Sequence, residues 1–134
     1  MRKAIRLLIV GAVAIMVGCA GGGSDSSNGT PTSPSNGSPT SSATITITSS
    51  GVSPKTVTIA AGGRVTFTNN DTRTHNMQSD PHPEHTDCPE LGQVGFLTPG
   101  QSLTSGNLNA VRTCGYHDHD DFSNTRFWGT IVIQ

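Results

Sequence analysis

Three residues, one near the middle of the chain and two near its end, have the side chains and spacing of a metal site. Cys114 is followed three positions later by His117, and His75 precedes them by about forty residues. One thiolate and two imidazoles suit copper in both of its oxidation states, because the soft sulfur favours Cu(I) and imidazole binds either state. The pattern therefore predicts a copper centre made by His75, Cys114 and His117.

Other side chains could complete this site or replace part of it. Residues 78–92 combine three prolines with acids, two histidines and a cysteine, which predicts a long and stiff loop. His119 lies two positions after His117, so on a strand both side chains would face the same way. The candidate additional or alternative metal ligands are His82, His85, His119, Asp121 and Met77. For the two histidines of the loop, plain solvent exposure is the competing interpretation.

The elements that must position these residues are expected to be short β-strands. Polar and β-branched residues alternate strictly over 44–48, 56–59 and 65–68, and a turn at Gly62-Gly63 is expected between the last two. Further strands are expected at 101–104, 110–114 and 129–133. No stretch repeats apolar residues at helical spacing over ten residues. Short strands separated by Gly, Pro and Asn turns indicate an all-β antiparallel sandwich or barrel.

The chain begins with the pattern of an export signal. A basic start is followed by the apolar run 7–17, which has the length of a signal-peptide core and is too short to span a bilayer. Small residues precede Cys19, as at the processing site of bacterial lipoproteins. We therefore expect 1–18 to be a lipoprotein signal peptide and Cys19 to carry lipid, with an ordinary secretory signal as the alternative. The expected location is the cell envelope, lipid-anchored, facing the periplasm or the cell exterior.

The next segment is expected to be a tether and the remainder a single domain. Residues 19–43 are almost only Gly, Ser, Thr, Pro and Asn, so they cannot bury a core and should form a flexible spacer. Residues 44–134 are long enough for one modest core. They carry five basic and eight acidic side chains, a net charge of −3 with neutral histidines. With no basic patch, nucleic acid is excluded as a partner.

The cysteine count opens a second interpretation of the site. The chain has three cysteines, and lipid on Cys19 would leave Cys88 and Cys114 as an even pair. Cysteines in an exported protein usually form disulfides. A Cys88–Cys114 disulfide would remove the thiolate and leave the histidines and carboxylates as a site for Cu(II) or Zn(II). We prefer Cys114 as a copper ligand and keep the disulfide as the alternative.

The order and spacing of the segments resemble the cupredoxins of the plastocyanin type. The resemblance covers nearly all of residues 44–134. The matching segments are 53–59, 61–70, His75-Asn76, the proline-glycine turn in 96–102, Cys114 to His117 and the closing strand 129–133. The resemblance implies a cupredoxin-like, antiparallel Greek-key β-sandwich with a type 1 copper site.

The resemblance also implies roles for individual residues. His75, Cys114 and His117 would bind the copper, and Asn76 would be the asparagine whose hydrogen bonds join the two ligand loops. The axial methionine of the family has no counterpart in the residues after His117. That position would be empty or filled by another side chain, the candidates being Gln78, His119 and Asp121.

These expectations converge on a membrane-tethered copper protein that carries single electrons to a redox partner protein of unknown identity. The first alternative is a histidine-based copper-binding or copper-delivery protein. The second is a metal-free β-sandwich cross-linked by a disulfide between Cys88 and Cys114. The sequence shows no nucleophile elbow, phosphate loop or catalytic carboxylate pair, so we expect neither an enzyme nor a small-molecule substrate.

Overall fold

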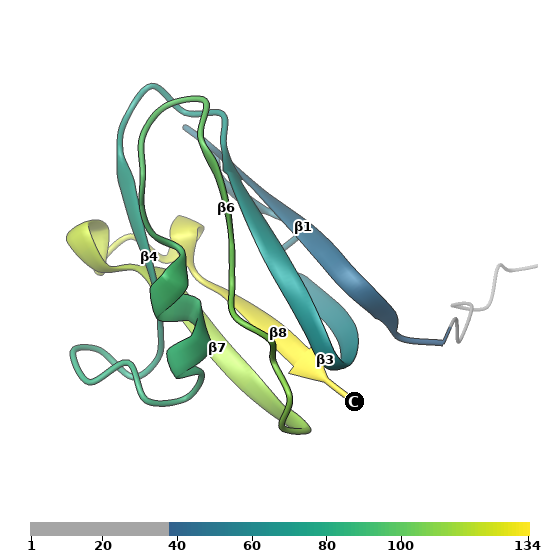
Figure 1. Cartoon of the computed structure of the whole chain (residues 1–134). Helices are drawn as coiled ribbons and strands as arrows, with labels where there is room; N and C mark the ends of the chain where they lie inside the picture. The colour runs from purple at the N-terminus through teal and green to yellow at the C-terminus, as the bar shows by residue number, and fades with distance from the viewer. Residues whose placement is uncertain (1–37) are drawn as a thin grey trace, which may run out of the picture. The chain divides into compact units, whose positions relative to one another are not determined.

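The computed structural model describes residues 38–134, which form eight strands and three short 3-10 helices (Figure 1). The strands are β1 (Thr40–Thr48), β2 (Gly51–Ser53), β3 (Thr56–Asn69), β4 (His75–Ser79), β5 (Gly95–Leu97), β6 (Ser102–Thr104), β7 (Arg112–Asp118) and β8 (Gly129–Ile133). The 3-10 helices are η1 (Pro89–Gln93), η2 (His119–Asp121) and η3 (Thr125–Phe127). In this part of the chain no helix has the length and apolarity to cross a membrane.

The predicted signal peptide and the lipid site at Cys19 lie outside the described residues. The end of the predicted tether, residues 38–43, lies within them. β1 begins at Thr40, inside the segment 19–43, so the fold starts before the expected residue 44. Thr40–Ala43 belong to the strand because they continue the pairing of β1 with β3.

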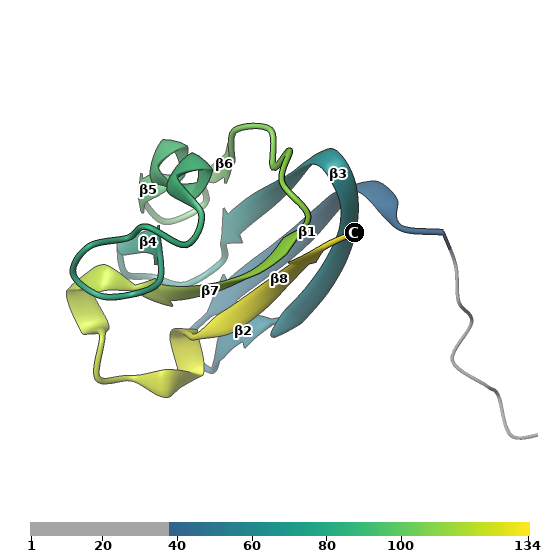
Figure 2. The ribbon, with the colours of Figure 1, turned by 90° about the horizontal axis from the view of Figure 1, so that it is seen from below.

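Strand β3 joins the two layers of the sandwich. The strand order is β2-β1-β3-β8-β7-β4-β5, with β6 also paired to β3. The first part of β3 pairs with β8, whereas its second part pairs with β1 and β6. Figure 2 shows β3 curving from one layer to the other. The sequence predicted two strands separated by a turn here, and the structure shows one bent strand.

Two glycines make this bend possible. Gly62 has a φ of +85°, a conformation that L side chains rarely adopt. A Cβ on Gly63 would lie only 2.8 Å from the carbonyl oxygens of Ala60 and Ser41. The pairing of β1 with β3 continues on both sides of this bend, with one shift in register between Thr40 and Ser42.

The sheet is mixed rather than purely antiparallel. The pairs β1·β3 and β3·β8 are parallel, which corrects the expectation of an antiparallel sandwich. Period-two alternation identifies a strand but says nothing of its direction relative to its neighbour. The core between the layers follows the predicted alternation. Its largest fully buried side chains include Ile45, Ile47, Ile59, Phe67, Tyr116, Ile131 and Ile133.

Candidate metal centre

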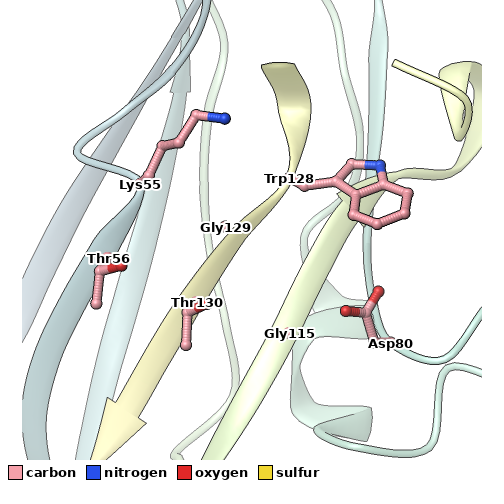
Figure 3. A pocket seen from close by; sticks show the side chains of 7 residues that line it. All are labelled: Lys55, Thr56, Asp80, Gly115, Trp128, Gly129 and Thr130. Atoms are coloured by element: carbon pink, nitrogen blue, oxygen red, sulfur yellow. The ribbon is translucent and has the colours of Figure 1, made fainter. Parts of the chain in front are cut away.

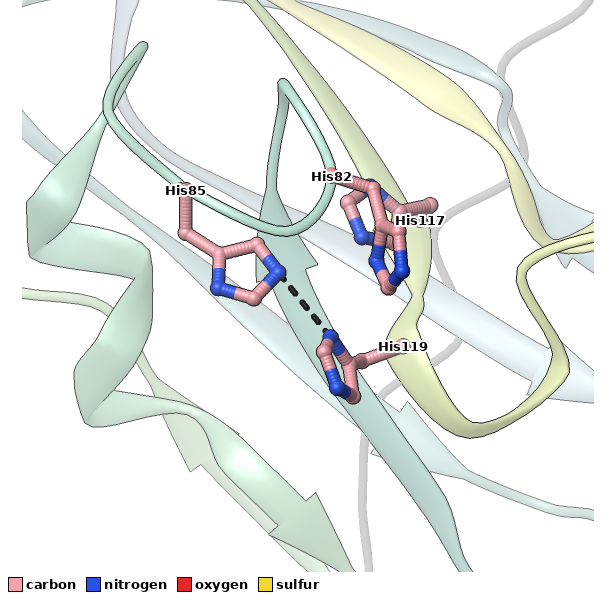
Figure 4. A group of neighbouring side chains, drawn as sticks. All are labelled: His82, His85, His117 and His119. Carbon is pink, nitrogen blue, oxygen red and sulfur yellow. Dashed lines mark hydrogen bonds between the residues drawn. The ribbon is translucent and has the colours of Figure 1, made fainter.

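Four histidines converge at one end of the β4–β7 pair. His82 and His85 come from the loop after β4, His117 lies on β7, and His119 begins η2. Each offers one ring nitrogen, and these four nitrogens lie within 4.8 Å of one another (Figure 4). Two imidazole nitrogens on one tetrahedral ion, each about 2.0–2.1 Å from the metal, lie about 3.3 Å apart. Small side-chain rotations would therefore bring all four onto a single ion.

His117 is the most firmly held member of this four-histidine cluster. Its side chain is fully buried, and its Nδ1 lies 2.6 Å from Oδ1 of Asp80. A carboxylate only accepts hydrogen bonds, so Nδ1 carries the proton. The opposite nitrogen, Nε2, is buried and has no hydrogen-bond partner among residues 38–134, and the same holds for Nδ1 of His82. Because buried polar atoms are nearly always bonded, two such nitrogens in one cluster indicate a ligand position.

The other two histidines are already paired with each other. Nε2 of His85 lies 3.0 Å from Nδ1 of His119. Burial lowers the pKa of His85, and the neighbouring imidazoles of His119, His117 and His82 lower it further. Neutral imidazole is the form that binds metal. The environment of His85 therefore favours the ligating form.

An aromatic wall covers one side of the cluster. The ring of Phe122 stacks on His82 with centroids 4.3 Å apart and meets His117 edge-on at 4.9 Å. Trp128 packs behind Phe122 at 4.9 Å, and its indole N–H donates to the Phe122 carbonyl over 2.9 Å. These contacts restrict the His82 ring and cover one side of His117.

An open cleft of about 360 Å³ adjoins this wall. Figure 3 shows Trp128 and Asp80 on one side of the cleft, with Gly115 beside Asp80, and Lys55 on the opposite side. Asp80 thus borders the cleft and also bonds His117. The cleft and the cluster are joined through this one carboxylate.

His75, a predicted copper ligand, is not part of the cluster. It is fully buried, with Nδ1 2.7 Å from Oδ2 of Asp118 and Nε2 3.2 Å from Oδ2 of Asp71. Burial would raise the pKa of Asp71, but hydrogen bonds from the Thr72 amide and from His75 outweigh it and lower the pKa. Since both ring nitrogens of His75 face carboxylates, neither is directed at a metal.

Cys114 is bonded to Cys88, as in the alternative interpretation of the sequence. Both cysteines are buried, and a disulfide sulfur offers no thiolate. The structure therefore does not bring His75, Cys114 and His117 together as the predicted copper centre. The physical reason is the length of β7, which continues to Asp118 instead of ending at Cys114. Residues three apart on a strand face opposite sides, so Cys114 points into the core and His117 points away from it.

Asn76 connects the two segments that the sequence expected it to connect, although by other partners. Its backbone N–H donates to Oδ1 of Asp118 over 3.0 Å, and its side-chain amide donates to Asp120 over 3.2 Å. Gln78 in turn donates to the Asn76 side-chain oxygen over 3.1 Å. Asn76 thus joins the start of β4 to Asp118 and Asp120, the residues next to His117 and His119 in the sequence.

Two further candidate ligands also lie elsewhere. Met77 is buried in the core, in register with Asp118. Asp121 accepts a hydrogen bond from Asn124 and pairs with Arg73 at 3.4 Å, and these contacts lower the pKa of Asp121. Neither joins the cluster, whereas the other candidates, His82, His85 and His119, do.

The sequence interpretation missed Asp80 and Phe122, which contact the cluster, and Asp71 and Asp118, which hold His75. The sequence did contain a signal that Cys114 and His117 lie on opposite faces of β7. If the alternation of β7 is continued to residue 118, Gly115 and His117 fall on one face of the strand, and Cys114 falls on the other.

The sequence matches no protein-family model and no curated protein. Solved structures do match. A purple cupredoxin from Nitrosopumilus maritimus is 22% identical, over 69% of this chain and 99% of that one, with a TM-score of 0.52. Amicyanin from Paracoccus versutus is 18% identical over 69% and 81%, and auracyanin from Roseiflexus castenholzii is 16% identical over 72% and 98%, both with a TM-score of 0.52. The domain therefore has the cupredoxin fold, which confirms the predicted cupredoxin-like β-sandwich.

Proposed function

We propose that the protein binds copper through imidazole alone, at the four-histidine cluster of His82, His85, His117 and His119. The convergence of these four side chains carries the proposal. The buried Nε2 of His117 supports it, because this nitrogen has no hydrogen-bond partner among the described residues and its lone pair is free to bind a metal.

Copper is the ion that the donor set and the fold favour. Imidazole suits copper, zinc, nickel and iron, and among first-row divalent ions Cu(II) binds nitrogen sites most tightly. One solved structure of the same fold, an amicyanin variant, is named as a Cu(I) form. The acidic side chains around the cluster, among them Asp80 and Glu84, would also attract a cation.

In this proposal the domain binds or delivers copper at the cell envelope. The export signal in 1–18 and the small residues before Cys19 support a lipid anchor that faces the periplasm or the cell exterior. The segment after Cys19 would hold the domain away from the membrane surface.

Single-electron transfer is the second candidate function. The observation that favours it is the fold, which the domain shares with plastocyanin and auracyanin. In this alternative the copper of the same four-histidine cluster alternates between Cu(II) and Cu(I) and exchanges electrons with a redox partner protein. A reversible reduction potential for the copper-loaded protein, with transfer to an added redox protein, would separate a carrier from a delivery protein.

The test of the proposed site is a Cu(II) titration of the full chain carrying Cys19→Ser, followed by calorimetry. We expect one copper per chain. Separate alanine substitutions at the four histidines should each weaken binding at least about tenfold. His75→Gln is the matched control, because His75 is the only other histidine of the chain. No retained copper after dialysis would refute the proposal and leave a metal-free sandwich.

A further inference from the structure

We propose that Asp80, whose carboxylate packs against Gly115, is the positioning residue of the four-histidine cluster. It determines which nitrogen of His117 binds the metal. This inference rests on the proposed function. Asp80 bonds Nδ1 of His117 over 2.6 Å, on the side of the ring away from the unpartnered Nε2. In a neutral imidazole the hydrogen bond made by one nitrogen decides where the proton sits. The Asp80 carboxylate therefore keeps the proton on Nδ1 and the lone pair on Nε2.

The backbone holds Asp80 in place for this contact. Its N–H donates to the Gly115 carbonyl over 3.0 Å, which extends the pairing of β4 and β7 by one residue. The carboxylate then lies directly over Gly115, beside the His117 ring. Gly115 and His117 are two apart on β7 and share its outer face.

Gly115 is required for space and not for backbone conformation. Its φ does not lie in the left-handed region, so another residue could adopt the same backbone. A Cβ at this position, however, would overlap the carboxylate carbon and oxygen of Asp80. Any side chain at position 115 would displace the carboxylate and with it the hydrogen bond to His117. The absence of a side chain at Gly115 is thus part of the metal site.

The effect on metal binding follows from the chemistry of histidine ligands. A carboxylate on the far nitrogen orients the ring and raises its basicity, and loss of such a partner typically costs 10- to 100-fold in metal affinity. We expect Asp80→Ala and Gly115→Ala each to weaken Cu(II) binding by about that factor. Asp80→Asn keeps an oxygen that can accept from Nδ1, so it should lose less affinity than Asp80→Ala.

The double variant tests whether Gly115 acts through Asp80. If it does, adding Gly115→Ala to Asp80→Ala should cause no further loss, because the contact that Gly115 protects is already gone. Additive losses in the double variant would overturn this link. Gly92→Ala is the matched glycine control, since a Cβ there meets nothing within 4 Å. Asp87→Asn is the matched charge control on the same loop.

A second measurement does not depend on copper. In the metal-free full chain, ¹⁵N chemical shifts should show the His117 proton on Nδ1, and Asp80→Ala should move the population toward Nε2–H. A His117 ring already protonated on Nε2 in the parent would overturn the positioning role. A parent that binds no copper would instead overturn the proposed function, and the ¹⁵N shifts alone would then decide the role of Asp80.

Discussion

His75 and Asp118 form a buried pair in which Nδ1 of the imidazole lies 2.7 Å from a carboxylate oxygen. The second nitrogen of the same ring faces Asp71, and the ring packs on Phe127 with centroids 4.7 Å apart. Asp118 separates His117 from His119 in the sequence and points to the opposite side of the chain. The core thus uses His75 as a structural residue that joins two buried carboxylates. The histidines on either side of Asp118 in the sequence belong to the candidate copper site instead.

Replacing His75 should affect stability more than copper binding. In His75→Gln the carboxylates of Asp118 and Asp71 lose their shared partner, and breaking a buried pair typically costs about 3–5 kcal/mol. Urea unfolding would measure this loss. Cu(II) affinity, measured on the folded variant, should stay within about threefold of the parent, a small fraction of the change that ligand loss produces. The matched variant His117→Ala should lose copper affinity, and a folded His75→Gln protein without copper affinity would contradict the assignment.

Acid should weaken the fold partly through Asp71. The folded-state pKa of Asp71 lies below its ordinary value of 3.8, so its contribution to stability is present above that value. The contribution is lost as the pH falls through the lower, folded-state pKa. Below about pH 4, the free energy of unfolding should therefore drop more steeply in the parent than in Asp71→Asn. Asp121→Asn is the comparison, because the pKa of Asp121 is also lowered but its more exposed ion pair is screened by water. Equal slopes for the parent and Asp71→Asn would refute the role given to Asp71.

The disulfide should stabilise the domain without binding the metal. Cys88 and Cys114 are 26 residues apart, and closing a loop of that length stabilises a fold by about 3.5 kcal/mol in the chain-entropy model. In the full chain carrying Cys19→Ser, no thiol should react after unfolding. Replacing both cysteines by serine should lower the free energy of unfolding by about that amount while copper still binds. Two reactive thiols in the unfolded parent would contradict the pairing.

The bend of β3 should be sensitive to a single methyl group. Gly63→Ala would press a Cβ against the carbonyl oxygens of Ala60 and Ser41, both of them backbone atoms that cannot rotate away. Crowding of this kind typically costs about 1–3 kcal/mol. Thermal unfolding would measure it, with Gly92→Ala as the neutral reference. An unchanged melting temperature would show that the bend tolerates a side chain.

The fold was predictable because its signals are local. Alternation over 44–48, 56–59 and 129–133 gave strands that the structure contains, and the ordered segments gave the cupredoxin resemblance. The direction of pairing was not predictable, because the bend at Gly62-Gly63 carries β3 between layers and no local pattern encodes that path.

The site was harder to predict because its key contacts are distant in sequence. The run Gly115 to Asp118 has few strand-forming residues, and its pairing with β4 and β8 makes it part of β7. That extension separates Cys114 from His117. No spacing rule connects His82 and His85 to His117, since only the folded loop brings them within reach.

The most direct test is the visible absorption and electron paramagnetic resonance spectrum of the full chain, carrying Cys19→Ser, loaded with one equivalent of Cu(II). The four-histidine account predicts a weak ligand-field band and nitrogen hyperfine structure that changes in the His117→Ala and His119→Ala variants. An intense blue or purple thiolate-to-copper band, lost on Cys114→Ser, would contradict it and restore His75, Cys114 and His117 as the copper ligands.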